Sequence, residues 1–343
     1  MKLLRGYLYA GFKPTNICNP FQGYLDVDPQ IDKYMKRRCV MKCVFLDCAI
    51  INPGDISWEK LQSTVEFEYY DRTAPDQIAE RLKGAEGVFI DGTALTREIM
   101  ESCSDLKYIG IAATGYNHVD LDAAKELGIA VTNVSGYAAD AVAQHAIALL
   151  LYITNKIQIY NDAVADGEWN RAEDYTFIKA PLTLLAGKSI GIVGYGAIGK
   201  RVAEIAEALG MTVNIYSRDR EAAIASDVLS LNCPLTKENA GMIDAGFISK
   251  MKDGAILINT ARGGLVDEYA LAAALKSGKL AGAGLDVLAS EPPAPDDPLV
   301  GLENCVITPH IGFIPIEARQ LIIDTLAENL QSFIDGGDLN RIV

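Results

Sequence analysis

Histidine and basic residues are scarce in this chain of 343 residues. Only three histidines are present, and 45 Asp and Glu outnumber 31 Lys and Arg, which leaves a formal net charge of −14. Such an acidic chain is a poor partner for DNA, RNA or an anionic membrane surface. A small anionic substrate is still compatible with this charge, because a local site can be positive within an acidic protein.

Long apolar runs and paired cysteine motifs are also absent. No run reaches the roughly 18 residues of a membrane-spanning helix, and no signal-peptide core opens the chain. The seven scattered cysteines are odd in number and lack C-x-x-C spacing, which is typical of free thiols in a reducing compartment, so we expect a cytoplasmic protein. Cys39, Cys43 and Cys48 lie close together, but their spacings match no usual zinc pattern, and we predict no metal.

What is plentiful is apolar material, at half of the residues, and the length favours two domains. Residues 1–40 show no clear period. We interpret them as an extension of unknown role, or as the product of a misplaced start codon with Met41 the true beginning. From Met41 onward, strand-like and helix-like stretches alternate, which predicts parallel α/β structure. The expected strands are 44–46, 87–90, 108–112, 130–134, 189–193, 212–216, 227–231, 255–259, 282–286 and 305–308.

Helix signals lie between these strands. A helix over 121–127 has Asp120 as a candidate N-cap and Gly128 as a stop. A long helix is expected over 140–166. The last helix, over 315–335, is expected to return and pack on the first domain.

A glycine-rich turn follows the strand 189–193. Gly194, Gly196 and Gly199 have the G-x-G-x-x-G spacing, and a helix composition begins directly after them. In such turns the glycines allow a tight bend, close approach of a pyrophosphate and close helix packing. Free amides at the helix N-terminus then face the phosphates. We predict that this turn binds a nicotinamide dinucleotide.

The end of the next strand bears on the choice of coenzyme. An acid that binds the adenosine ribose is usual there, about 20 residues on, but this chain has Ser217 followed by Arg218 and Arg220. A hydroxyl and a guanidinium suit a 2′-phosphate, which a carboxylate would repel. We therefore predict that NADP(H) is favoured over NAD(H). The alternative is that Asp219 takes the role of the acid and the arginines are solvated.

Three polar residues follow strands of the second domain. Arg262, Glu291 and His310 all lie beyond carboxyl ends of strands, where ligands bind in open parallel sheets. They suit reduction of a 2-keto acid: Arg262 would bind the carboxylate and polarise the keto oxygen, His310 would exchange the proton, and Glu291 would hold the imidazole. For the other histidines we expect structural roles, one capping a helix and the other lying within one.

With these motifs, the sequence from Met41 onward resembles the D-2-hydroxyacid dehydrogenases. The resemblance rests on the glycine turn, Asn232–Thr236, Asn259–Gly263, Gly284–Val287 with Glu291-Pro292, and Thr308–Gly312. It implies two Rossmann-like α/β domains, flavodoxin-like and dinucleotide-binding, with parallel sheets and the active site in an interdomain cleft. The domains would be 41–139 plus 314–343 for the substrate and 140–313 for the dinucleotide.

The resemblance also implies roles for individual residues and an assembly. The catalytic residues fall on Arg262, Glu291 and His310, and the loop that binds the substrate carboxylate falls on Thr114 and Gly115. A homodimer built through the cofactor domain is usual. The expected cofactor contacts are Gly194, Gly196, Ala197, Ile198, Gly199, Ser217, Arg218, Cys233, Pro234, Thr260, Ala261, Asp286 and Gly312.

Within the family, segments such as Gly136-Tyr137 and Gly167-Glu168-Trp169 most resemble glycerate dehydrogenases, also called hydroxypyruvate reductases. The expected reaction is therefore reduction of hydroxypyruvate or glyoxylate to D-glycerate or glycolate, or the reverse. Alternatives are another D-2-hydroxyacid dehydrogenase, of D-lactate or phosphoglycerate type, and a dinucleotide-sensing, corepressor-like binding protein. The complete Arg–Glu–His set favours the enzyme.

Two features depart from the family pattern. Related glycerate dehydrogenases tend to carry Asn-Lys where this chain has Asp91-Gly92-Thr93, which leaves the choice of substrate open. Only nine residues separate Ser217 from the strand expected at 227–231, whereas a βα crossover needs at least about 10–12. Either the third strand of this domain is deleted, or the sequence lacks a segment.

Overall fold

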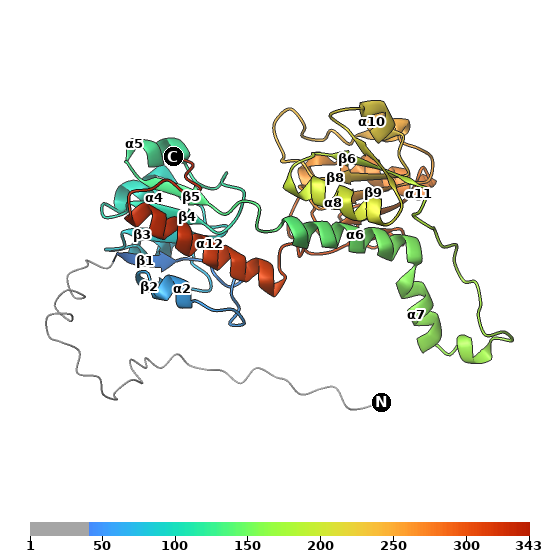
Figure 1. Cartoon of the computed structure of the whole chain (residues 1–343), viewed down its shortest axis with the longest axis horizontal. Coiled ribbons are helices and arrows are strands. Elements are labelled where there is room, and N and C mark those ends of the chain that lie inside the picture. Colours follow the sequence, from blue (N-terminus) through green and yellow to red (C-terminus); the bar gives the residue numbers. More distant parts are fainter. Residues whose placement is uncertain (1–40) are drawn as a thin grey trace. The chain divides into compact units, whose positions relative to one another are not determined.

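The computed structural model describes residues 41–343. The N-terminal extension, with Cys18 and Cys39, lies outside these residues. Two parallel sheets organise the described part of the chain (Figure 1). The predicted α/β class with two parallel sheets is therefore confirmed.

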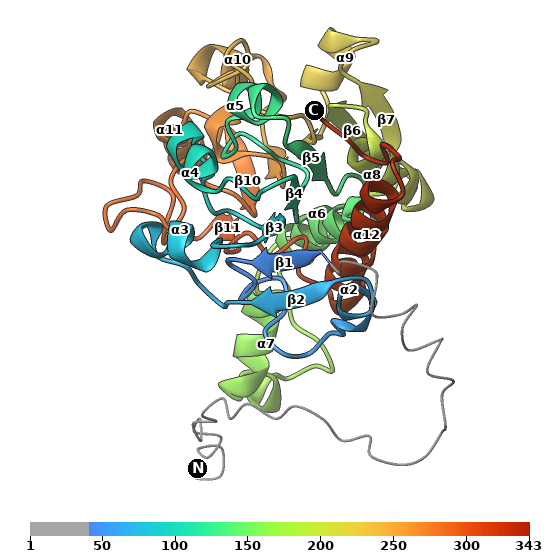
Figure 2. The same ribbon diagram turned by 90° about the vertical axis from the view of Figure 1, so that its left-hand side faces the viewer.

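The first sheet contains five strands in the order β2-β1-β3-β4-β5 (Figure 2). All of its neighbouring strands pair in parallel, and the order is that of flavodoxin-like folds. One edge strand, β2, was missed by sequence reasoning because it is short and largely exposed. The strands are β1 (Lys42–Phe45), β2 (Glu66–Tyr69), β3 (Gly87–Ile90), β4 (Tyr108–Ile111) and β5 (Ala130–Asn133).

Helices cover both faces of the first sheet. Alternate residues of a strand point to opposite faces, so Val44 packs in one apolar cluster with α3, α4 and α5, whereas Phe45 packs in another with α2 and α12. The last helix, α12, thus lies against the first sheet as predicted (Figures 1 and 2). The helices are α2 (Glu59–Gln62), η1 (Pro75–Gln77), α3 (Ile78–Arg81), α4 (Arg97–Ser102), α5 (Leu121–Glu126) and α12 (Ile316–Ile334).

The second sheet has six parallel strands in the order β11-β10-β9-β8-β6-β7. One apolar cluster joins it to α6 and α8, and another joins it to α10 and α11. The strands are β6 (Ser189–Val193), β7 (Thr212–Ile215), β8 (Val228–Leu231), β9 (Ala255–Asn259), β10 (Leu280–Leu285) and β11 (Cys305–Ile307). The helices are α6 (Ala139–Asn155), α7 (Ile157–Ala165), α8 (Ala197–Ala208), α9 (Arg220–Ile224), α10 (Ala245–Lys250) and α11 (Glu268–Ser277), with η2 (Trp169–Arg171) and η3 (Gly263–Leu265).

The connection from β7 to β8 is short and contains only the helix α9. These two strands flank β6 on opposite sides, so α9 has to cross β6, and it does so over Gly191. A Cβ on Gly191 would lie only 2.2 Å from the carbonyl oxygen of Ala223. Because β7 and β8 are each one residue shorter than expected, residues 216–227 are free to make the crossover. No strand lies beyond β7 in the described sheet, so β7 is its edge.

Two helix predictions were wrong in part. The single helix expected over 140–166 is two helices, because Lys156 has a left-handed backbone with φ of +50° that ends α6 and begins α7. Figure 1 shows α7 leaving the line of α6. Asp120 caps α5 as predicted, by accepting a hydrogen bond from the Ala123 amide at 2.9 Å. His118 therefore does not cap that helix.

Candidate functional site

The glycine turn connects β6 to α8 as predicted. Gly194 has a φ of +93°, and a Cβ there would lie 2.6 Å from backbone atoms of Asn232 and Cys233. A Cβ on Gly199 would lie 2.0 Å from the Gly194 carbonyl oxygen, so helix and turn are in direct contact. By contrast, no atom lies within 4 Å of a Cβ on Gly196. The turn therefore leaves room for a ligand beside Gly196, at the start of α8.

Two buried polar atoms near this turn fit a bound dinucleotide. The hydroxyl of Thr260 and the side-chain oxygen of Asn232 have no hydrogen-bond partner within residues 41–343. Asn232 directly follows β8, which is the neighbour of β6 in the sheet. Thr260 directly follows β9, which is one strand further along. A buried polar group without a hydrogen-bond partner lowers the stability of a protein. A ligand with polar groups at the carboxyl ends of these strands would supply partners for the Thr260 hydroxyl and the Asn232 side-chain oxygen. Cys233, Pro234 and Ala261 follow the same strands, and Ala197 and Ile198 form the first turn of α8.

The residues after β7 have the exposure that the coenzyme prediction requires. Ser217 and Arg218 are exposed, and the Arg218 guanidinium lies 5.3 Å from the ring centre of Tyr195 in the glycine turn. Asp219 instead caps α9, because its carboxylate accepts a hydrogen bond from the Ala222 amide at 3.0 Å. The acid that would disfavour a 2′-phosphate is thus engaged in local structure.

The imidazole of His310 contacts the carboxylate of Glu291, which was predicted to orient it. The Nδ1 atom of His310 lies 2.7 Å from Oε2 of Glu291, while Oε1 accepts a hydrogen bond from the Leu288 amide at 3.0 Å. Both side chains are about 40% exposed, at 41% and 39%. In residues 41–343 no hydrogen bond engages Nε2 of His310, so this nitrogen is left for a substrate.

Arg262 follows β9, the neighbour of the strand β10 that precedes Glu291. It is exposed, and its Nη2 lies 3.4 Å from the position of a Cβ on Gly115, in the loop after β4. The next residue, Gly263, packs its backbone directly on the chain at Leu288, where a Cβ would lie 1.9 Å from the Leu288 carbonyl carbon. This contact joins the Arg262 loop to the loop that carries Glu291.

Asp286 organises the His310 loop. Its carboxylate, 2% exposed, accepts hydrogen bonds from Thr308 Oγ1 at 2.6 Å and from the amides of Ile311 and Gly312 at 2.8 Å. Burial alone would raise the pKa of Asp286, but hydrogen bonds from His145, Thr308 and these amides lower it below its usual value. His310 itself has a left-handed φ of +56°, so the Asp286 contacts constrain a strained turn at the site.

His145 therefore has a positioning role that sequence reasoning missed. It lies within α6 as expected, and its Nε2 is 2.9 Å from Thr308 Oγ1 and 3.2 Å from Asp286 Oδ1. The hydroxyl of Thr114 is not free to donate to a substrate, because it already donates to the Val134 carbonyl oxygen at 3.1 Å. Backbone groups of Thr114 and Gly115 are then the better candidates for a carboxylate.

The role of Asp47 was also missed by sequence reasoning. Asp47, directly after β1, accepts hydrogen bonds from the backbone of residues 91–93, the loop flagged as unusual. The signal available in the sequence was its place shortly after a strand, a position that it shares with Arg262, Glu291 and His310. No metal-binding group of three or more His, Cys, Asp or Glu occurs in the described residues.

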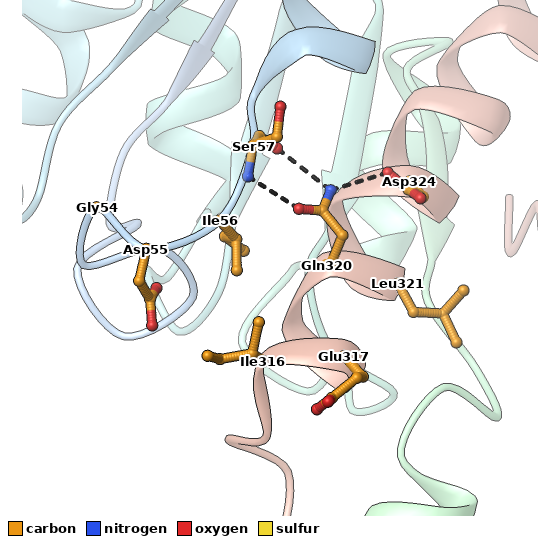
Figure 3. Close-up of a pocket in the computed structure, with 9 residues that line it drawn as sticks. All are labelled: Gly54, Asp55, Ile56, Ser57, Ile316, Glu317, Gln320, Leu321 and Asp324. Atoms are coloured by element: carbon orange, nitrogen blue, oxygen red, sulfur yellow. Dashed lines mark hydrogen bonds between the residues drawn. The ribbon is translucent and has the colours of Figure 1, made fainter.

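One hollow of the described residues is lined by neither His310 nor Arg262. It has a volume of about 820 Å³ and lies between the loop at Gly54–Ser57 and the start of α12 (Figure 3). Gln320 closes one side of it, by accepting from the Ser57 amide at 2.8 Å and donating to Asp324 at 3.0 Å. Its wall lacks the Arg–Glu–His set, and we assign no catalytic role to it.

Across residues 41–343, no helix combines the length and apolar character needed to cross a membrane.

Comparisons with known proteins agree with this geometry. The model of the family "D-isomer specific 2-hydroxyacid dehydrogenase, NAD binding domain" matches residues 147–312. The hydroxypyruvate reductase of Blautia hydrogenotrophica is 41% identical over 320 residues, which cover 88% of this chain and 99% of that protein. The glycerate dehydrogenase of Methylorubrum extorquens is 40% identical over 312 residues, covering 88% and 98%.

A solved structure shows the same fold. An acyclic imino acid reductase in complex with NADPH and D-arginine has a TM-score of 0.77 at 30% identity, over 88% of this chain and 100% of that one.

Proposed function

Because the chain belongs to the D-isomer specific 2-hydroxyacid dehydrogenase family, we propose that it reduces hydroxypyruvate to D-glycerate or glyoxylate to glycolate, or catalyses the reverse. Two of its most similar relatives are a hydroxypyruvate reductase and a glycerate dehydrogenase. The observation that carries the proposal is the His310–Glu291 pair at 2.7 Å, which leaves Nε2 of the imidazole for a substrate.

Each site residue then has a defined task. Hydride is supplied by a nicotinamide when it is bound. Nε2 of His310 donates a proton to the forming alkoxide, and Glu291 orients the ring through its contact with Nδ1. The Arg262 guanidinium binds the substrate carboxylate together with backbone groups at Thr114 and Gly115, and it polarises the keto oxygen.

The division of labour follows the two sheets. We assign residues 41–139 plus 314–343, which hold the first sheet and α12, to substrate binding. Residues 140–313, which hold the second sheet and the glycine turn, are assigned to the dinucleotide. The apolar clusters support this division, because the buried partners of α12 in the cluster that contains it all come from residues 43–134.

The coenzyme is proposed to be NADP(H) rather than NAD(H). The support is the exposed pair of Ser217 and Arg218, together with the capping role that occupies Asp219. The ratio of kcat/KM for NADPH to that for NADH tests this, with a value above one expected. Arg218→Ala should lower the ratio by about 10- to 100-fold, because a charged hydrogen bond is worth roughly 1.5–3 kcal/mol. A ratio below one would refute the preference.

A homodimer is proposed on the apolar surface of α7 and the chain after it. Several large apolar side chains of this stretch are exposed, and clustered exposed apolar residues mark interaction surfaces. Sedimentation at micromolar concentration should give twice the chain mass, and Ile178→Asp should shift the protein towards monomer. A wild-type monomer would refute this assembly. The exposed apolar residues are Ile157, Ile159, Val164, Trp169, Tyr175, Ile178, Leu182 and Leu184.

The reaction itself is tested by following NADPH oxidation with a panel of 2-keto acids. Hydroxypyruvate and glyoxylate should be turned over, and His310→Ala should slow the chemical step by about 10²–10⁴-fold. The panel also includes pyruvate and 3-phosphohydroxypyruvate, which test the lactate and phosphoglycerate alternatives. No turnover of hydroxypyruvate or glyoxylate by the wild type would refute the proposal.

A further inference from the structure

The loop after β3 is held rigidly by Asp47. One carboxylate oxygen of Asp47 accepts from the Asp91 amide at 2.8 Å, and the other accepts from the Gly92 amide at 2.8 Å and the Thr93 amide at 2.6 Å. The Thr93 hydroxyl adds a fourth bond at 2.7 Å. Because β1 and β3 are parallel neighbours, Asp47 and Asp91 follow strand ends at the same edge of the sheet. The backbone at Asp91 is thus preset before any ligand binds.

The side chain of Asp91 is left without a partner. Its carboxylate makes no hydrogen bond and no ion pair with any residue in the range 41–343, although the residue is half-buried. Most buried polar groups in proteins are paired. A carboxyl group held in place by a fixed loop, and itself unpaired, is therefore a candidate for contact with a ligand.

Strand order and neighbouring charges relate Asp91 to the residues of the proposed reaction centre. His310 and Asp47 both act on it electrostatically, and it acts in turn on Tyr137, which also senses Arg262. Burial, and then the neighbouring charge of Asp47, raise the pKa of Asp91 to about 7, while His310 acts in the opposite direction. The carboxyl group is therefore within electrostatic range of His310. Strand β3, which Asp91 follows, also pairs in parallel with β4, which precedes the Gly115 loop that Arg262 approaches.

The orientation of a 2-keto acid leaves one substituent to be recognised. With its carboxylate on Arg262 and its keto oxygen at His310, only the group on C3 is unaccounted for. Resting on the proposed function, we infer that Asp91 is a specificity-determining residue that accepts a hydrogen bond from a hydroxyl group on C3 of the substrate. Hydroxypyruvate carries such a donor, pyruvate has a methyl group there, and glyoxylate has no C3 atom.

The inference is tested by comparing three substrates in variants at one position. At saturating NADPH, Asp91→Ala should lower kcat/KM for hydroxypyruvate by about 10- to 100-fold, the value of a hydrogen bond to a charged group. Pyruvate and glyoxylate should change by no more than about threefold. Asp91→Asn keeps an acceptor oxygen and should retain part of the preference. Asp76→Ala removes an exposed carboxylate of η1 and serves as the matched control.

The pH dependence separates recognition from a structural role. In the wild type, the ratio of kcat/KM for hydroxypyruvate to that for pyruvate should change between pH 6 and 8, and in Asp91→Asn it should be flat. An equal loss on all three substrates, or a flat ratio in the wild type, would overturn the inference. Failure of the wild type to reduce any of the three would instead refute the proposed function.

Discussion

The contact between Gly263 and the Glu291 loop allows a quantitative prediction. A Cβ on Gly263 would lie 1.9 Å from the carbonyl carbon of Leu288, 2.1 Å from its oxygen and 2.3 Å from the Ala289 nitrogen. All three are backbone atoms, so no side-chain rotation relieves the overlap. An ordinary contact starts near 3.4 Å, and the two loops must therefore separate by roughly 1.5 Å in Gly263→Ala.

This displacement has a cost in stability and a cost in catalysis. Overpacking costs about 1–3 kcal/mol, and we expect the upper end because the strained atoms are backbone. The Leu288 amide donates to Glu291 at 3.0 Å, so the shift reaches the carboxylate that orients His310. A misplacement of about 1 Å at a catalytic group can lower the rate by about 10²-fold. Gly263→Ala should therefore lose about 3 kcal/mol of unfolding free energy and about 100-fold in kcat/KM.

The adjacent glycine supplies the control. A Cβ on Gly264 would lie 2.8 Å from a terminal carbon of Leu235, a flexible side chain that is 43% exposed. Gly264→Ala should cost less than about 1 kcal/mol and leave kcat/KM within about threefold. Urea unfolding followed by circular dichroism and steady-state kinetics with hydroxypyruvate give the two quantities. If the two variants behave alike in both measurements, the reasoning about this contact is refuted.

Three further predictions follow from single contacts. Burial acts to raise the pKa of Asp227, but hydrogen bonds from Lys252 and Ser189 lower it to about 2. The ionised carboxylate should therefore contribute about 2 kcal/mol to the free energy of unfolding above pH 4, and this contribution should be lost as the pH falls towards 2. Acid unfolding of Asp227→Asn should lack this step, and an unchanged acid transition would contradict the assignment. Glu291→Gln should lower kcat by about 10–100-fold with little change in KM, since the ion pair with His310 acts on proton transfer; a change in KM alone would argue against that role. Asp47→Ala should destabilise the protein in urea by about 2–4 kcal/mol, because three backbone amides lose their acceptor, and a loss no larger than that of Asp76→Ala would show that the loop does not depend on Asp47.

The candidate site was largely predictable because of how parallel sheets are built. Arg262, Glu291 and His310 were identified as residues that follow strands, and carboxyl ends of parallel strands meet at one edge of a sheet. The structure pairs His310 with Glu291 at 2.7 Å and places the strands as expected, to within a few residues. The glycine turn was predictable for a similar reason, since its spacing reflects contacts within one strand–turn–helix unit.

Other features depend on contacts between segments far apart in the chain, and no local pattern reports them. Asp47 reaches the loop at residues 91–93, and His145 of α6 reaches the Asp286–Thr308 pair. The break at Lys156 was missed because the apolar composition continues through it. The crossover of α9 over Gly191 likewise depends on packing between a helix and a distant strand.

Sequence alone thus determined the α/β class and predicted the dinucleotide turn and the Arg–Glu–His set, because each rests on short-range spacing or on a strand end. Only the tertiary structure decided how these residues are held: Asp286 is buried under the His310 loop, and Asp91 is left unpaired within electrostatic range of His310. The physical reason is that hydrogen bonding and burial of a polar side chain depend on which distant segment lies against it, and that partner is chosen only when the sheets and helices pack.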